Sequence, residues 1–187
     1  MFEVIDLINR DYPRGGIGRP GLTAGICLRK DFTFSEERSS APGMLLAVSR
    51  VHESVPLFLV EGLKRRLGGS LRDRKVAVLG LAFKANTDDE RDSLSHKLIR
   101  LLERELADVA VHDPHVSTPT QSFEDAVIDA DAVVLATNHA EFCGPSGLRR
   151  IADGARNQAL VVDPWDCFGA GQVFAFADEI SAVTARP

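Results

Sequence analysis

Residues 75–81 read Lys75-Val76-Ala77-Val78-Leu79-Gly80-Leu81, a continuous apolar run that follows the charged turn Arg72-Asp73-Arg74. Strands that are buried on both faces of a parallel sheet have this pattern. Three similar short runs follow along the chain, at residues 109–114, 132–136 and 159–164. Stretches with helical spacing separate the four runs, at residues 93–106, 123–128 and 148–152. This alternation predicts an α/β fold whose parallel sheet is built by right-handed crossovers.

Polar residues follow three of these strands, and they predict where a ligand would bind. Asp113, Thr137-Asn138 and Asp163 come directly after apolar runs. Ligands of parallel sheets sit outside the carboxyl ends of the strands. The first strand, however, leads into Gly80-Leu81-Ala82-Phe83-Lys84 rather than G-x-G-x-x-G. The sheet is therefore expected to be Rossmann-like, but a dinucleotide would miss its usual pyrophosphate cradle.

The chain is expected to form two regions, residues 1–70 and residues 71–187. The first region begins with an amphipathic stretch at 2–9 and contains a long helix at 44–67, which Gly68-Gly69 ends. Apolar residues recur on this helix at spacings of three and four, among them Val48, Val51, Val55 and Leu59. The second region is the α/β domain. The long helix is therefore predicted to form an arm that leads into that domain.

Composition is that of a soluble globular protein and excludes several classes. Of 187 residues, 44% are apolar and 26% are charged, and the net charge is −5. An acidic chain lacks the electrostatic footprint of a nucleic-acid or anionic-membrane binder. The three cysteines form no metal-binding pattern and no secreted disulfide framework. The first residues do not have the pattern of a signal peptide, so a cytoplasmic location is expected.

A group of suggestive residues surrounds Cys27. Small residues at 23–25 allow a backbone to approach a ligand closely, and Lys30 and Asp31 would share a helix face with the thiol. A helix start and a lysine would both favour the thiolate, which suits covalent catalysis. The residue types alone still favour the simpler interpretation, in which Cys27 is a small buried apolar residue.

The pattern as a whole resembles the UDP-glucose/GDP-mannose dehydrogenase family. Residues 20–31 are similar to the catalytic-cysteine motif of that family, and residues 78–93 are similar to the opening of its C-terminal UDP-binding domain. In the second motif the matching residues are Val78-Leu79-Gly80-Leu81-Ala82-Phe83-Lys84, Thr87-Asp88-Asp89, Arg91 and Ser93. His112-Asp113-Pro114 and Thr137-Asn138-His139 also match. The resemblance covers nearly the whole chain, with both motifs in the family's order.

The resemblance implies a UDP-sugar 6-dehydrogenase, which oxidises C6 of a nucleotide sugar twice with NAD and yields a uronic acid. By resemblance, Cys27 attacks the C6 aldehyde to form a thiohemiacetal that is oxidised to a thioester. Asp31 would help to activate the hydrolytic water, and Lys30 would belong to the same catalytic group. Lys30 and Arg91 match positions that contact NAD. The UDP-sugar would be held by Thr23, Ala24, Gly25, Phe83 and Lys84, with Arg14 reaching into the site of a neighbouring subunit.

Departures from the family pattern qualify this expectation. The family's N-terminal NAD domain has no counterpart in this sequence, so the expected identity is the central and C-terminal part of the enzyme, inactive without that domain. Trp165 stands where many UDP-glucose enzymes have an arginine that contacts substrate.

A homodimer through the helix at 44–67 is expected. The alternative functions are a non-catalytic UDP-sugar-binding module or a dimerisation module.

Simpler interpretations remain open for several residues. Phe83 could be a core residue, and Asp88, Asp89 and Arg91 could form a local ion-pair and capping cluster. The histidines have no metal-binding spacing, and no metal site is predicted. Cys143 and Cys167 are interpreted as packing residues.

Overall fold

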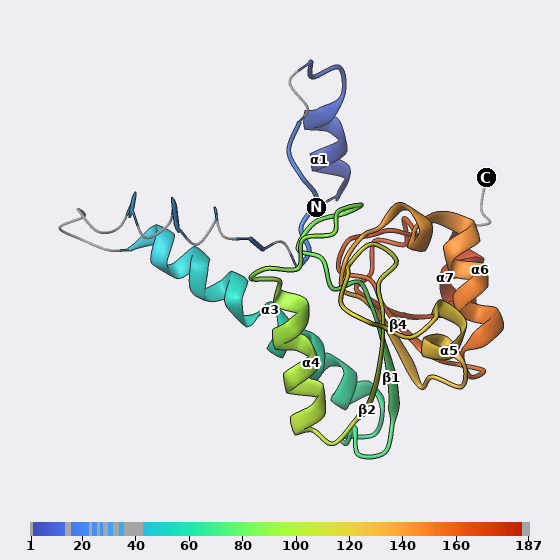
Figure 1. Ribbon diagram of the computed structural model, residues 1–187. Coiled ribbons are helices and arrows are strands. Elements are labelled where there is room, and N and C mark those ends of the chain that lie inside the picture. Colours follow the sequence, from blue (N-terminus) through green and yellow to red (C-terminus); the bar gives the residue numbers. More distant parts are fainter. Residues whose placement is uncertain are drawn as a thin grey trace.

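The computed structural model describes residues 2–13, 16–22, 24–25, 27, 30–31, 34–35 and 43–184. Its centre is a five-stranded sheet in the order β2-β1-β3-β4-β5 (Figure 1). The strands are β1 (Lys75–Leu79), β2 (Asp108–His112), β3 (Ala132–Leu135), β4 (Leu160–Val162) and β5 (Phe174–Phe176). The first four are parallel, with Val76 opposite both Val109 and Ala132. The predicted α/β fold with a mainly parallel sheet is therefore confirmed.

One strand was not predicted. β5 pairs antiparallel with β4, so that Val162 lies opposite Phe174, and it closes the edge of the sheet. The strand has only three residues, Phe174-Ala175-Phe176, which is too short for a readable period. Helix α7 (Ala177–Thr184) follows it directly and was also absent from the sequence-based prediction.

Helices cover both faces of the sheet (Figure 1). Helix α4 (Leu94–Arg104) connects β1 to β2 and packs beside α3 (Met44–Arg66). Helices α5 (Phe123–Val127) and α6 (Gly144–Gly154) connect the remaining parallel strands, and α6 packs against α7. A short 3-10 helix, η1 (Ala140–Phe142), precedes α6. Serine side chains cap two of these helices, Ser93 at α4 and Ser122 at α5, by accepting backbone N–H bonds.

Helix α3 has two halves with different surroundings. In its C-terminal half, Leu59 and Leu63 are fully buried in the core of the sheet domain, and Arg66 stacks over the Phe174 ring. In its N-terminal half, the side chains of Val48 and Val51 are 59% and 68% exposed. The predicted boundary at residues 70–71 falls between α3 and β1, but the core of the second region includes the end of α3.

The N-terminal segment carries α1 (Phe2–Asn9), which matches the predicted amphipathic stretch. In the part of the chain that the structure describes, no helix combines the length and the apolar character that a membrane span requires.

Candidate functional site at the carboxyl edge of the sheet

The order of the strands creates the site. β1 lies between β2 and β3, and the chain leaves β1 toward β2 before it returns to form β3. Such a reversal is the point at which open α/β sheets bind ligands. Gly80 ends β1 there with a φ of +102°, and a Cβ on it would lie 2.7 Å from the backbone nitrogen of Thr137. Only glycine fits this close approach between the two strand ends.

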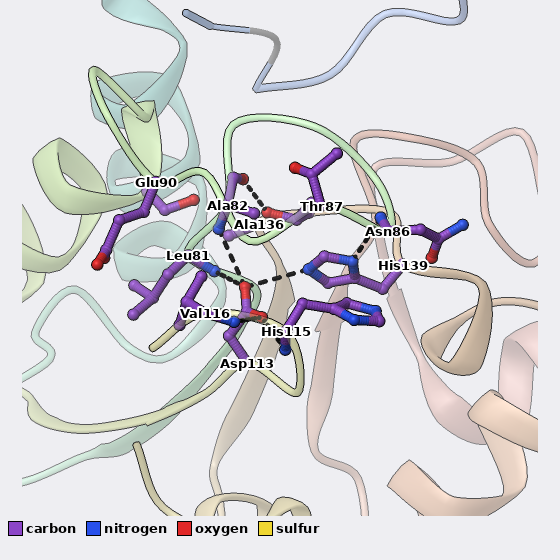
Figure 2. Close-up of polar contacts among 12 residues, drawn as sticks. Leu81, Ala82, Asn86, Thr87, Glu90, Asp113, His115, Val116, Ala136 and His139 are labelled. Carbon is purple, nitrogen blue, oxygen red and sulfur yellow. Dashed lines mark hydrogen bonds and ion pairs between the residues drawn. The ribbon is translucent and has the colours of Figure 1, made fainter. Parts of the chain in front are cut away.

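Asp113, the residue after β2, organises the loop that follows β1 (Figure 2). Its side chain is buried, with 4% of the residue exposed. Oδ2 accepts the backbone N–H groups of Leu81 (2.6 Å) and Ala82 (3.0 Å). Oδ1 accepts those of His115 (2.8 Å) and Val116 (3.2 Å). One carboxylate therefore fixes the backbone at the ends of both β1 and β2.

His139, which follows β3, completes this arrangement. It is fully buried, and its Nε2 lies 3.1 Å from Oδ2 of Asp113. Its Nδ1 accepts the backbone N–H of Asn86 (2.9 Å), so the ring proton is on Nε2 and is donated to Asp113. The Asn86 side chain in turn accepts the N–H of Ala140 (3.0 Å). We call Asp113, His139 and Asn86 the strand-end network.

The charge of Asp113 is stabilised by these donors. Burial alone would raise the pKa of its carboxyl. The hydrogen bonds from His139 and from the backbone N–H groups of Ala82, His115 and Leu81 outweigh that effect and hold the pKa well below its usual range. Asp113 is therefore an ionised acceptor at neutral pH, and its function is to hold the loop rather than to exchange protons.

The loop that this network holds presents Phe83 and Lys84. The N–H of Phe83 donates to the carbonyl of Asp89 (3.0 Å), which closes the loop. The hydroxyl of Thr87 donates to the carbonyl of Lys84 (3.1 Å), and the Lys84 side chain is exposed. Phe83 is half-buried, with one side of its ring against residues before Cys27. The loop therefore presents an aromatic ring, Phe83, and an exposed ammonium group, Lys84, at the carboxyl edge of the sheet.

Arg91, predicted to contact NAD, forms an ion pair within its own segment. Its Nε and a terminal nitrogen bond both carboxylate oxygens of Asp89, at 2.9 and 2.7 Å. The pair lowers the pKa of Asp89 to about 2, chiefly through the hydrogen bonds from Arg91. The Arg91 side chain remains 73% exposed. The Asp89–Arg91 pair bears out the ion-pair part of the local cluster that the sequence left open, whereas Ser93 caps α4, and the role of Arg91 toward NAD stays a prediction.

The segment that leads to Cys27 packs directly on this edge. The backbone at Gly21 passes so close to the ring of Trp165 that any Cβ would collide with it. A Cβ on Gly25 would lie 3.2 Å from the Phe83 ring, and Leu22 and Ala24 are buried. Gly21 and Gly25 therefore pack against two aromatic side chains, Trp165 after β4 and Phe83 after β1.

An arginine clamps the same segment. One terminal nitrogen of Arg19 bonds Asp166, which follows Trp165, at 3.1 Å, and the other bonds Asp6 of α1 at 3.0 and 3.2 Å. Trp165 itself is buried, and its indole N–H donates to the carbonyl of Ala136 at 3.3 Å. The ring of Trp165 therefore supports the backbone at Gly21.

The predicted catalytic residues are only partly brought together. Cys27, Lys30 and Asp31 are helical and exposed, and Nζ of Lys30 lies 3.7 Å from Oδ1 of Asp31. Among the residues that the structure describes, no hydrogen bond joins Cys27 to either of them. The other predicted binding residues, Arg14 and Thr23, lie outside the described residues.

The sequence left two parts of the site without partners. It placed polar residues at the ends of β2 and β3 and took His139 as structural or solvated, and the burial of His139 bears out the structural role. It predicted neither the partners of His139 nor any role for Arg19. The partners of these residues are far away in sequence: His139 and Asn86 are 53 positions apart, and Arg19 and Asp166 are 147 apart. The available signals were that His139 follows a strand end and that Thr137-Asn138-His139 matches the family pattern.

The connection from β1 to α4 does not fit the pyrophosphate of NAD. A dinucleotide cradle needs a short glycine-rich turn that leads straight into a helix N-terminus with free N–H groups. Here residues 80–93 intervene, and the N–H of Ser95 is already bonded to the hydroxyl of Ser93 (3.2 Å). We therefore assign no step of a reaction to NAD at this turn.

Comparison with known proteins identifies the family. Residues 77–170 match the model of the UDP-glucose/GDP-mannose dehydrogenase family, UDP binding domain, which is half of the chain. The chain belongs to this family. The match spans all of the strand-end network as well as Phe83, Lys84 and Trp165. The resemblance found in the sequence motifs is thereby confirmed for the UDP-binding part.

Relatives of this dehydrogenase family member include nucleotide-sugar enzymes from archaea and bacteria. It is 34% identical over 150 residues to the UDP-N-acetyl-D-mannosamine dehydrogenase of Pyrococcus horikoshii, covering 76% of this chain and 35% of that protein. It is 26% identical to the NDP-N-acetyl-D-galactosaminuronic acid dehydrogenase of Ralstonia nicotianae, covering 94% of this chain and 42% of that protein. The chain thus spans about two fifths of the length of these relatives.

Solved structures of the same family have the same fold. The UDP-N-acetyl-D-mannosamine dehydrogenase of Pyrococcus horikoshii superposes with a TM-score of 0.73 at 30% identity, over 89% of this chain and 40% of that chain. A UDP-glucose dehydrogenase from Pyrobaculum islandicum gives 0.68 at 30% identity, over 88% of this chain and 40% of that chain.

Proposed function

We propose that this chain is the UDP-sugar-binding part of an NAD-dependent UDP-sugar 6-dehydrogenase and that it supplies Cys27 as the nucleophile. One observation carries the proposal most directly: Gly21 and Gly25, which precede Cys27, pack against the rings of Trp165 and Phe83 beside the loop that the strand-end network holds. A ligand seated at this edge would therefore reach both the UDP-binding loop and the thiol.

Binding is assigned to the loop and to the segment that covers it. Lys84 is exposed at the loop and offers its ammonium group to a diphosphate, and the Phe83 ring offers an apolar face. Gly25 brings its backbone close to that ring, and Ala24, Thr23 and Arg14 are proposed to contact the sugar nucleotide as well. The buried carboxylate of Asp113 would act indirectly, by fixing the backbone of Leu81 and Ala82.

The chemistry assigned to Cys27 is covalent. Its sulfur would add to the aldehyde carbon C6, and water would later release the acid from the thioester, with Asp31 helping to position that water. The exposure of Cys27, Lys30 and Asp31 leaves room for a substrate above them. The oxidation between these steps needs a hydride acceptor, which the family resemblance gives as NAD. Lys30 and Arg91 are the residues proposed to contact NAD.

Selective alkylation tests the assignment of the nucleophile and the site together. Cys27 is exposed, whereas Cys143 and Cys167 are half-buried, so iodoacetamide should modify Cys27 first. We expect saturating UDP-sugar to slow that reaction at least about fivefold, because a ligand at the carboxyl edge would cover the thiol. Mass spectrometry of peptides gives the rate at each cysteine.

The control for this experiment is Lys84→Ala, which should abolish the protection while leaving alkylation in the absence of ligand unchanged. If UDP-sugar binds but Cys27 remains unprotected, the chain is a UDP-sugar-binding module without a catalytic thiol, which is the alternative function. If no UDP-sugar binds, both functions are excluded.

Helix α3 is proposed to form a homodimer. Its N-terminal half exposes a stripe of apolar side chains that the described part of this chain does not cover, namely Met44, Leu45, Val48 and Val51. Light scattering should therefore give twice the 20.3 kDa chain mass. Val48→Asp should shift the protein to the monomer, and Arg65→Asp, an exposed position near the other end of α3, should not. A Val48→Asp protein that stays dimeric would contradict the proposal.

The proposed compartment is the cytoplasm, where thiols are kept mainly reduced, where disulfides are transient, and where UDP-sugars are available as substrates.

A further inference from the structure

Two cysteines that the proposed chemistry does not use lie in contact. The sulfur atoms of Cys143 and Cys167 are 2.7 Å apart, although the residues are 24 positions apart in sequence. Cys143 precedes α6, and Cys167 lies in the loop after β4. The N–H of Gly144 donates to the carbonyl of Cys167 (3.1 Å). A backbone hydrogen bond therefore joins the two segments in addition to the contact between the two sulfur atoms. Both thiols are half-buried, which leaves them within reach of a small reagent.

The surroundings distinguish the two thiols. The hydrogen bond between the two sulfur atoms lowers the pKa of Cys143. The same hydrogen bond, together with burial and the nearby carboxylate of Asp163, raises the pKa of Cys167. The carboxylate of Asp163 accepts the N–H of Phe168 (3.1 Å), the residue after Cys167, and so disfavours a negative charge on Cys167. We therefore expect Cys143 to react first and Cys167 to resolve the product.

We propose that Cys143 and Cys167 are a modification site, at which a low-molecular-weight disulfide such as glutathione disulfide forms an intramolecular disulfide. The Cys143 thiolate attacks one sulfur of glutathione disulfide and releases the first glutathione thiolate. Cys167 gives up its proton and attacks the Cys143 sulfur, which releases the second. Two protein thiols are oxidised to one S–S bond, and one glutathione disulfide is reduced to two glutathione molecules, which take up the two protons.

The bond would join two elements that surround the candidate site. The loop after β4 carries Trp165 and Asp166, which hold Gly21 and Arg19. Asp163 shapes this loop by accepting the N–H groups of Trp165 (3.2 Å) and Phe168 (3.1 Å). A crosslink from Cys167 to Cys143 would fix the loop to the start of α6. The modification site therefore includes the loop that contacts Gly21 and Arg19, which precede Cys27 in the chain. It is separate from the Cys27 thiol itself.

The test oxidises the reduced, folded chain with glutathione disulfide, blocks the remaining thiols with N-ethylmaleimide and digests it without reduction. We expect tryptic peptides 105–149 and 157–187 to be joined and no maleimide to be found on Cys143 or Cys167, whatever share of the exposed Cys27 carries glutathione. Oxidation should raise the midpoint of thermal unfolding by about 5 °C, because the crosslink restricts the unfolded chain. Emission of the single tryptophan, Trp165, should change with the same time course.

Two variants make the outcome decisive. Cys167→Ser should leave a glutathione adduct on Cys143 and no joined peptides, whereas Cys27→Ser should form the crosslink at the rate of the unchanged chain. The proposal is overturned if glutathione accumulates on Cys27 while Cys143 and Cys167 both react with maleimide. It is also overturned if Cys143 keeps its glutathione in the unchanged chain. Neither result bears on UDP-sugar binding, so the proposed function is tested separately.

Discussion

Replacing Asp113 with alanine will lower the free energy of unfolding by about 3–5 kcal/mol, because it leaves several buried donors without an acceptor. The donors are the backbone N–H groups of Leu81, Ala82, His115 and Val116 and the ring N–H of His139. For a chain of this size, that loss corresponds to a thermal midpoint about 10 °C lower. Urea denaturation followed by circular dichroism measures the change directly.

The matched control is Asp108→Ala, at the other end of the same strand, where the side chain is exposed. Its effect should stay within about 0.5 kcal/mol. Asp113→Asn, which keeps an acceptor oxygen but loses the charge, should fall between the two. If Asp113→Ala costs no more than Asp108→Ala, the strand-end network does not hold the loop.

The same carboxylate predicts how stability depends on pH. The pKa of Asp113 is lower in the folded chain than in the unfolded chain, so the unfolded state binds a proton first as the pH falls. The contribution of Asp113 is therefore fully present above about pH 5 and declines as the pH falls below about 4, the ordinary pKa of aspartate. Asp113→Asn should flatten the stability curve in that range.

Replacing Cys27 with serine will abolish formation of the uronic acid once the chain is joined to a nicotinamide-binding domain. We propose to supply that domain from the part of the Pyrococcus horikoshii relative that this chain does not match. The joined protein should reduce NAD when its UDP-sugar substrate is added. With Cys27→Ser, acid formation should drop by at least about a thousandfold, because serine cannot form the thioester.

The control is Cys143→Ser, which removes a thiol away from the proposed nucleophile and should keep turnover within about twofold. Chromatography of the products separates the aldehyde from the acid. If Cys27→Ser still yields acid at the original rate, Cys27 is not the nucleophile, and the resemblance describes ancestry alone.

The fold could be predicted largely from the strands. Four apolar runs separated by stretches with helical spacing specify a parallel sheet, because strands buried on both faces need no alternation and the helices between them are amphipathic. β5 could not be predicted in this way, since Phe174-Ala175-Phe176 is defined by its pairing with β4 rather than by its own pattern. Helix α7 depends on the same pairing for its position.

The site could be predicted in position but not in detail. Asp113 and Thr137 follow strands, and topology alone brings such residues to one edge. The contact between His139 and Asn86 depends on how the loop after β1 folds back, which no local pattern encodes. Trp165 was recognised as a departure from the family, but its contact with Gly21 appears only once the N-terminal segment is packed on the sheet.

Calorimetric titration of the chain with UDP and, separately, with NAD tests the central claim most directly. The loop after β1 lacks a dinucleotide cradle, but it presents Phe83 and Lys84 from a backbone fixed by Asp113. We expect UDP to bind at least about tenfold more tightly than NAD, and Lys84→Ala to remove most of that difference. Tighter binding of NAD than of UDP would contradict the assignment of this edge as a UDP-sugar site.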